Sequence, residues 1–336
     1  MFTVDSYPLA VLLCVVTMLC WGSWANTQKL ASKAWSFQLF YWDYSLGVLI
    51  LALMLAFTLG STGTTGRAFL ADLAQAGDKW LGLACLGGVI FNLSNILLVA
   101  AIDIAGLAVA FPIGVGLALV LGVITTYWAT ETGNFPMISA GVIAILLAII
   151  LDAIAYRRLS HESQQLPIKG LVLSVFAGAL MGWFYSFVAQ SIGTIDPITG
   201  RLTPERLSPY TALVLFSVGL FLSNFVWNSF VMRWPFSGPT VSYRDYFEKG
   251  NVRLHIIGIS GGIIWNLGMG LNLIASSAAG SALSYGLGQG ATLVGAIWGV
   301  FIWKEFRAGP RGTSGLLAAM FVLYLVGLGI LVASKL

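Results

Sequence analysis

Several polar side chains interrupt the apolar stretches of this chain at spacings that would gather them on common helix faces. Asn92 and Asn95 are three residues apart, and Tyr285 and Gln289 are four apart, so each pair would share one face of a helix. Amide groups donate and accept hydrogen bonds, and indole rings stack on flat solutes. The residues that this chemistry predicts for binding a small neutral polar solute are Asn92, Asn95, Asn266, Tyr285, Gln289, Trp21 and Trp183.

Some of these residues have a second use that the sequence leaves open. Asn92 and Asn266 lie inside apolar stretches, where an amide can instead bridge neighbouring helices at about 0.6–2 kcal/mol each. Cavity lining and helix bridging are therefore equal alternatives for this pair. Trp21 lies near the end of its stretch, where tryptophan also occurs as a residue of the membrane interface.

Asp43 is an acidic residue inside an apolar stretch, FQLFYWDYSLGV. A charged aspartate at the centre of a membrane helix costs roughly 2.5–3.5 kcal/mol on insertion scales, so such a group needs a purpose or a partner. Facing a cavity, Asp43 could carry a coupling proton, whereas held by interfacial water or by Lys29 and Lys33 it would be structural. Asp152 lies close enough to the end of its stretch to be solvated, and we expect Glu305 to brace a turn.

A stretch of about forty-five residues occurs twice in the chain, with its glycines and asparagine in step. Residues 87–133 begin GGVIFNLSN, and residues 261–309 begin GGIIWNLGM. A membrane protein built from two such halves is typically a transporter with its site between the halves near the bilayer centre. At one constant offset the matched pairs include Gly87/Gly261, Gly88/Gly262, Asn92/Asn266, Gly114/Gly288 and Gly116/Gly290.

The composition indicates that most of the chain lies in a membrane. Hydrophobic residues make up 58% of the 336 residues and charged residues 9%, against roughly 25% charged in a soluble domain. Helices satisfy their own backbone groups in lipid, and the alternating pattern of a membrane β-barrel is absent. Since a span takes roughly 20 apolar residues, we predict an all-α membrane protein of about ten transmembrane helices. They cover residues 8–26, 37–59, 80–102, 104–128, 135–156, 170–192, 210–232, 254–276, 280–303 and 313–334.

These spans divide into two halves of five. Residues 1–156 form the first five-helix repeat, 157–169 a short cytosolic linker, and 170–336 the second repeat. An odd number of spans per half places the second half upside down relative to the first. Lys and Arg number twelve in one set of loops and five in the other, which puts both termini outside the cell inner membrane.

The chain lacks the residues that several classes of function require. No GxxxxGK[ST] phosphate loop, serine elbow or His-x-x-x-His pair occurs, so we predict neither an enzyme nor a cofactor. Three cysteines without metal spacing and only two histidines make a metal site improbable. The formal charge of +4 is spread between apolar runs and indicates no nucleic-acid partner. A solute or ion gradient remains as the energy source.

The layout and several segments resemble the drug/metabolite transporter superfamily. Within it the chain is most similar to the ureide permeases, close to the glucose/ribose and rhamnose porters. The segments that carry the resemblance are YWDYSLGVLILALMLAFTLG at 41–60, GGVIFNLSNILLVAAIDIAG at 87–106, IWGVFIWKEFR at 297–307 and GLLAAMFVLYLVGLGILVAS at 315–334. The aromatic-Asp-Tyr-Ser start of the second span favours the ureide permeases, and GLVLSVFAGALMG at 170–182 favours the rhamnose porters.

The resemblance implies uptake of small polar organic solutes, ureides and nucleobases in one branch and monosaccharides in the other, usually coupled to protons. Plant ureide permeases carry a long central cytosolic loop, whereas residues 157–169 here read only RRLSHESQQLPIK. This departure favours a bacterial-type porter. We therefore expect a proton-coupled secondary transporter, monomeric or homodimeric, that works by alternating access. The alternative is a drug/metabolite exporter of the same superfamily. The twelve tryptophans favour this alternative, because an exporter needs a more aromatic cavity.

Overall fold

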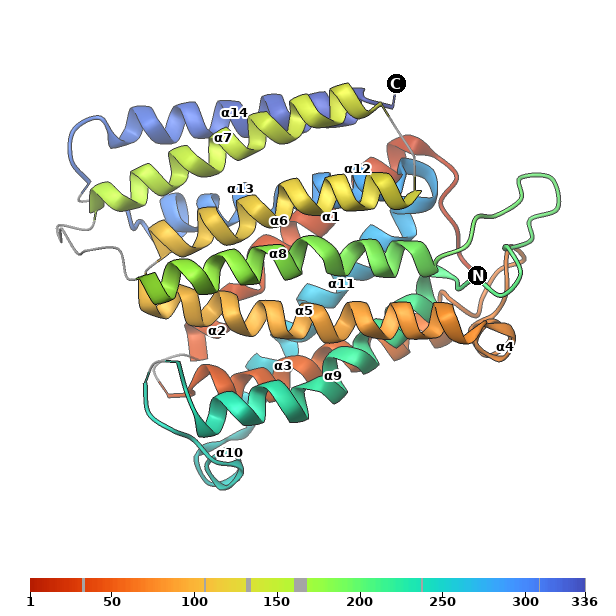
Figure 1. Cartoon of the computed structure of the whole chain (residues 1–336), viewed down its shortest axis with the longest axis horizontal. Helices are drawn as coiled ribbons and strands as arrows, with labels where there is room; N and C mark the ends of the chain where they lie inside the picture. The colour runs from red at the N-terminus through yellow and green to blue at the C-terminus, as the bar shows by residue number, and fades with distance from the viewer. Residues whose placement is uncertain are drawn as a thin grey trace.

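A computed structural model describes residues 1–31, 34–105, 107–130, 134–159, 168–236, 238–307 and 309–335. Lys33 and most of the predicted linker 157–169 lie outside the described residues. Within the described part of the chain the regular structure is helical, and the only strand-like pairing is two isolated bridges, Ile192 with Leu207 and Ile195 with Leu202 (Figure 1). The predicted all-α class is confirmed.

Ten helical segments of the described chain are long and apolar enough to cross a membrane. They match the ten predicted spans to within a few residues at most boundaries. In chain order the helices are α1 (Tyr7–Ser23), α2 (Ala25–Ala31), α3 (Phe37–Phe57), α4 (Phe69–Gln75), α5 (Asp78–Ala105), α6 (Leu107–Thr130), α7 (Phe135–Leu159), α8 (Ile168–Ser191), α9 (Pro209–Arg233), α10 (Tyr243–Lys249), α11 (Val252–Ala279), α12 (Ser281–Gly288), α13 (Ala291–Ile297), the π-helix η1 (Trp298–Ile302) and α14 (Thr313–Ala333). The short helices α4 and α10 lie in the two connections that follow α3 and α9.

The ninth span is discontinuous. It consists of α12, α13 and η1, and the two residues between α12 and α13 are Gln289 and Gly290. At this break the N–H of Gly290 donates to the carbonyl of Leu287, three residues back instead of four. π-helical turns and broken membrane helices are frequent at functional sites, because they free backbone groups to face a cavity.

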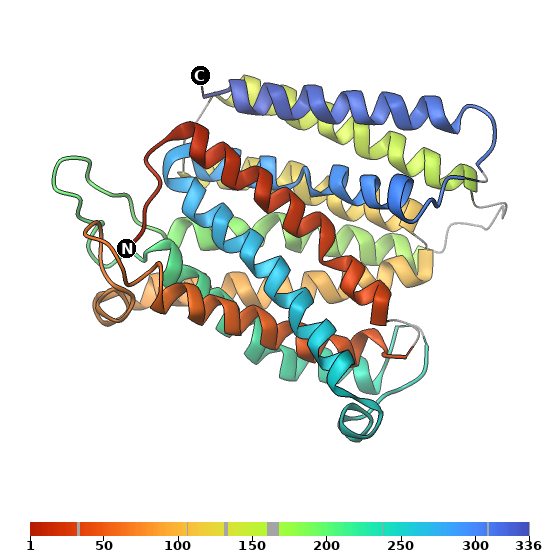
Figure 2. The same ribbon diagram turned by 180° about the vertical axis from the view of Figure 1, so that it is seen from behind.

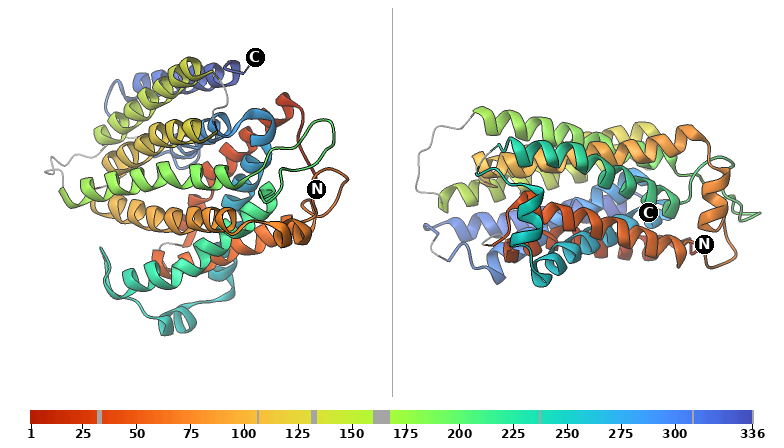
Figure 3. Two further views of the ribbon diagram at one scale, coloured as in Figure 1. Left: turned by 45° about the vertical axis from the view of Figure 1, so that its right-hand side comes forward. Right: turned by 90° about the horizontal axis from the view of Figure 1, so that it is seen from below.

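The spans are arranged in two layers, with α7 and α14 paired at one edge (Figures 1 and 3). Helices α5, α6, α8 and α9 lie toward the viewer in Figure 1, and α1, α3 and α11 in Figure 2. Helix α5, the third span, packs on α8 and α9, the sixth and seventh spans. Helix α11, the eighth span, packs on α1 and α3, the first and second. The third span of each set of five therefore contacts the first two spans of the other set.

Glycines permit the close approach of these packed helices. A Cβ atom on Gly88 of α5 would overlap the carbonyl oxygen of Phe216 in α9, and one on Gly262 of α11 would overlap that of Tyr44 in α3. Small residues bring membrane helices close because van der Waals packing holds helices together in lipid. Gly88 and Gly262 are matched members of the sequence repeat, so the repeat marks equivalent crossings.

The two ends of the bundle differ in what they carry. The terminal end holds both chain termini, α4 and the segment 192–208 (Figure 1). The basic end holds α2, α10 and the connection from η1 to α14. Its described cationic side chains are Lys29, Arg157, Arg158, Lys169, Arg233, Arg244, Lys249, Arg253, Lys304, Arg307 and Arg311.

Candidate functional site

A cavity of about 390 Å³ lies between the two layers. Its lining begins at the basic end with Lys29, whose side chain is 46% exposed, and Glu305. It ends in the middle of the bundle at Asn95 and Gln289, which are 4% and 8% exposed. The cavity therefore reaches the middle of the molecule from the basic end.

Aromatic rings form the inner wall of the cavity. The indoles of Trp21 and Trp265 are stacked, with ring centroids 5.9 Å apart and planes at 13°. Phe91 packs 4.4 Å from Trp265 and 4.9 Å from Phe184, also between centroids. Rings at these distances and tilts pack favourably, and their faces offer a flat apolar surface to a solute.

Two amide side chains reach this aromatic wall from opposite layers. The Nδ2 of Asn95 on α5 donates to the hydroxyl of Tyr41 at 3.1 Å. Gln289, at the break between α12 and α13, is only 8% exposed, lines the cavity and makes no side-chain hydrogen bond with the described residues. A side-chain amide both donates and accepts hydrogen bonds, so Gln289 is placed to bond with a molecule that enters the cavity.

Three of the residues predicted for solute binding, Trp21, Asn95 and Gln289, line this cavity together. Trp183 does not: its side chain is on the outer surface of α8 and is 48% exposed. Tyr285 is fully buried behind the cavity wall, where its hydroxyl donates to the carbonyls of Ala118 and Met181.

Asn92 and Asn266 do not line the cavity and instead tie helices together at equivalent crossings. The Nδ2 of Asn92 donates to the carbonyl of Leu220 in α9 at 3.2 Å and to the hydroxyl of Ser223. The Nδ2 of Asn266 donates to the carbonyl of Val48 in α3 at 2.7 Å. The sequence left cavity lining and helix bridging open for this pair, and in this structure both asparagines bridge helices.

The cavity is closed on its terminal side by buried polar contacts between layers. The hydroxyl of Tyr185 donates to Oδ1 of Asn272, and Nδ2 of Asn272 donates to the carbonyl of Ser284 at 2.7 Å. The rings of Tyr185 and Tyr285 pack 4.7 Å apart. These bonds hold α8, α11 and α12 together between the cavity and the terminal end.

Asp43 lies outside the lining of the cavity, in a cluster that joins three helices. Its carboxylate is 2.9 Å from Nδ1 of His255 in α11 and accepts a hydrogen bond from the hydroxyl of Tyr246 in α10. Burial, and next the bonded carboxylate of Asp43, raise the pKa of Tyr246, which keeps this phenol a donor. His255 is 212 residues from Asp43, and no local sequence pattern pairs them.

A chain of charged and polar groups lies at the mouth of the cavity. Glu305 accepts from Nζ of Lys29 at 2.7 Å and from the hydroxyl of Tyr156 at 2.8 Å. Asp152, one turn before Tyr156 on α7, also lines the cavity and is only 7% exposed. The expectation that Asp152 is solvated was wrong, because the end of α7 lies beneath the turn that carries Glu305. Among the described residues no group of three side chains could hold a metal ion.

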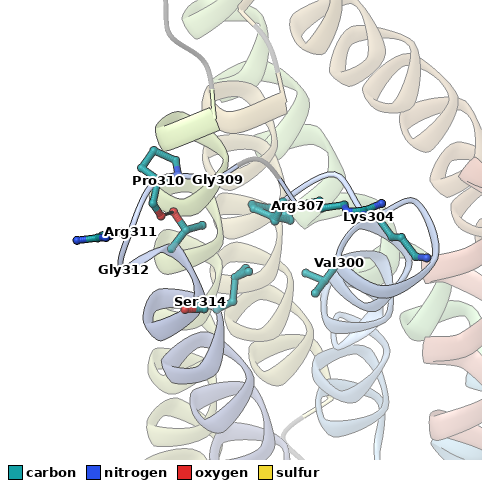
Figure 4. Close-up of a pocket in the computed structure, with 11 residues that line it drawn as sticks. Val300, Lys304, Arg307, Gly309, Pro310, Arg311, Gly312 and Ser314 are labelled. Atoms are coloured by element: carbon teal, nitrogen blue, oxygen red, sulfur yellow. Dashed lines mark hydrogen bonds between the residues drawn. The ribbon is translucent and has the colours of Figure 1, made fainter.

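A second cleft of about 480 Å³ lies at the basic end, between η1 and the start of α14 (Figure 4). Its lining includes Lys304, Arg307 and Arg311. None of the side chains predicted for solute binding lies there. The cavity between the layers is therefore the candidate site.

The sequence matches one family of membrane transport proteins along nearly its whole length. The model of the ureide permease family matches residues 40–166 and 156–334. The chain belongs to the ureide permease family. It is thus a multi-pass membrane transporter, similar to ureide permease 1 of Arabidopsis thaliana at 25% identity over 100% of this chain and 99% of that protein. Ureide permease 5 of the same plant is 24% identical over 99% of this chain and 96% of its own length.

A solved structure extends the comparison to the fold. One crystal structure superposes on this chain with a TM-score of 0.58, over 96% of this chain and 95% of the chain in that structure. The two sequences are 15% identical. At that identity the likeness shows the shared fold alone.

Proposed function

We propose that this protein is a secondary transporter for a small neutral polar organic solute such as a ureide or nucleobase. The observation that carries the proposal is the Gln289 side chain, which makes no hydrogen bond with the described residues and lies beside stacked indoles at the inner end of the cavity. A monosaccharide would use the same amides and rings. Ureides are favoured because the similar Arabidopsis proteins are named ureide permeases.

The cavity supplies a specific set of contacts for such a solute. A flat ureide ring stacks against Trp21 and Trp265, while its N–H and C=O groups bond with the amides of Asn95 and Gln289. The volume of about 390 Å³ suits a small solute, since ligand pockets run from about 300 to 1,000 Å³. Asn92, Asn266 and Tyr285 act in this account only by holding the helices around the site, and Trp183 lies on the outer surface.

Transport proceeds by alternating access between two inverted halves, residues 1–156 and 170–336. The support for inverted halves is that α5 and α11 cross their partners with matched glycines and matched asparagine bonds. By the Lys and Arg distribution the basic end faces the cytosol and both termini lie outside the inner membrane, so this conformation is open inward. Rocking of the halves would close the basic end and open the terminal end.

A proton gradient supplies the energy for uptake in this proposal. The sequence left Asp43 as one candidate for the coupling carboxylate, with a structural role as the alternative, and His255 and Tyr246 bond to it. A drug/metabolite exporter is the second candidate, because aromatic rings dominate the inner wall. Uptake assays separate the two, since an exporter protects cells from drugs without accumulating ureides.

Replacing the unpartnered amide tests the site directly. We expect Gln289→Ala to lower uptake of labelled allantoin into proteoliposomes about tenfold, because a lost hydrogen bond to a buried solute costs about 1–3 kcal/mol. Gln190→Ala is the matched control, since its amide bonds to the carbonyl of Ser186 within its own helix. Full allantoin uptake by a folded Gln289→Ala protein would contradict the site.

A further inference from the structure

Asp152 is a buried carboxylate that the proposed function does not use. It is 7% exposed, it lines the cavity, and its Oδ1 is buried with no hydrogen-bond partner among the described residues. Burying a charged carboxylate without a partner costs several kcal/mol in a membrane protein, so such a group tends to hold a proton. The side chain therefore lies where a proton carrier is required, beside the cavity.

Among the described residues, the groups that interact with Asp152 add no positive charge to it. Tyr156 on its own helix, Glu305 after η1 and Tyr324 of α14 are the groups that interact with it electrostatically. Two are phenols, and Glu305 is acidic. The nearby cation, Lys29, is bonded at 2.7 Å to Glu305. A proton on Asp152 removes the repulsion between the two carboxyl groups.

The fold keeps open a route from Asp152 to the water at the basic end. Tyr156 and Glu305 meet in front of Gly299 in η1, where a Cβ atom would lie 2.7 Å from the hydroxyl of Tyr156 and 3.1 Å from Oε2 of Glu305. Any side chain at this position would push the pair apart. Lys29 and Glu305 are 46% and 31% exposed, so the chain of groups that starts beside Asp152 ends in solvent.

Asp43 differs from Asp152 in each of these respects. Both of its oxygens lie within 3.0 Å of Nδ1 of His255, and Oδ1 also accepts from Tyr246. It is not part of the cavity lining. These bonds fasten α3 to α10 and α11.

We propose that Asp152 is the carboxyl group that takes up and releases the coupling proton, and that Asp43 is a structural anchor. This inference rests on the proposed function. A proton from water adds to the Asp152 carboxylate when the cavity faces outside and returns to water past Glu305 when it faces the basic end. Because Asp152 and the solute amides line one cavity, the charge of Asp152 bears on solute binding.

Chemical labelling tests the protonation of Asp152 without any solute. Dicyclohexylcarbodiimide, an apolar reagent, modifies protonated carboxyl groups, and peptide mass spectrometry locates the product. In the full-length protein in nanodiscs at neutral pH, we expect modification of Asp152 and none of Asp43 or Glu305. The modification should weaken as the pH rises and vanish in Asp152→Asn. Modification of Asp43 in place of Asp152, or of no carboxyl group, would overturn the proposal.

A transport ratio tests the coupling itself. The rate of allantoin accumulation under an inward proton gradient is divided by the rate of allantoin exchange without a gradient. We expect this ratio to fall to one in Asp152→Asn and to stay well above one in Asp43→Asn; the reverse order would overturn the assignment. If the wild type moves no allantoin, uracil or glucose, the solute proposal fails, and the labelling result still decides the role of Asp152.

Discussion

At the scale of single residues, the hydrogen-bond partners of the side-chain amides distinguish the repeated asparagines from the amides of the candidate site. Asn92 and Asn266 each donate from Nδ2 to a backbone carbonyl of a crossing helix, and the Oδ1 of each is buried with no partner among the described residues. Asn95 and Gln289 lie along the cavity. Repetition in sequence therefore marks residues that hold the helices, and the residues that we propose for solute binding need not be repeated.

Substitution of the bridging asparagines should give matched losses of stability. We expect Asn92→Ala and Asn266→Ala each to lower the free energy of unfolding by about 0.6–1.7 kcal/mol, the range measured for polar contacts between membrane helices. Thermal unfolding of the purified variants measures this. A large loss in one variant with none in the other would show that the two crossings are not equivalent.

At the scale of elements, the crossings of α5 with α9 and of α3 with α11 depend on glycine. Gly262 has no room for a side chain, since its Cβ would overlap the backbone of Tyr44. Gly82, on the exposed part of α5, has no atom within 4 Å of a built Cβ. Substitution at Gly262 therefore tests the need for close helix packing, and substitution at Gly82 tests only the intrinsic cost of glycine in a helix.

Alanine substitution should have opposite signs at these two positions. Gly262→Ala should lower the melting temperature because α3 and α11 must move apart. Gly82→Ala should leave it unchanged or raise it, since alanine is favoured over glycine in a helix interior by up to about 1 kcal/mol. Thermal unfolding of both variants checks the expectation, and equal effects at the two positions would contradict it.

The elements themselves were largely predictable, whereas the site was predictable only in part. A membrane span is a local property, so apolar length alone located all ten. The four-residue spacing of Tyr285 and Gln289 pointed to the ninth span. The spacing could not show that the helix breaks beside Gln289, so that Gln289 lines the cavity and Tyr285 lies behind its wall. The pairing of Asp43 with His255 joins residues 212 apart, which no local pattern encodes.

At the scale of the whole molecule, one end of the bundle is open and the other is fastened. Arg67 lies at the centre of the fastened terminal end. Its guanidinium bonds to the buried carboxylate of Asp72 at 2.9 Å and to the carbonyls of Leu202, Thr203 and Arg206. In the proposed cycle these bonds must break when the cavity opens outward.

Removal of this guanidinium should loosen the terminal end selectively. We expect Arg67→Ala to speed hydrogen exchange in segment 192–208 about tenfold or more, because several bonds are lost and Asp72 is left buried without its cation. Helix α10 at the basic end is the internal control. Unchanged exchange in 192–208 would contradict the fastening role, and faster exchange in α10 as well would indicate general unfolding.

Ligand-induced thermal stabilisation tests the central claim, that the cavity beside Gln289 binds a small neutral polar solute. A ligand raises stability as its concentration exceeds its dissociation constant. Wild type, Gln289→Ala and Gln190→Ala would be heated with allantoin, uracil or glucose. The account predicts that allantoin or uracil raises the melting temperature of the wild type and Gln190→Ala, and that Gln289→Ala loses the shift. An equal shift in all three proteins, or none in the wild type, would contradict it.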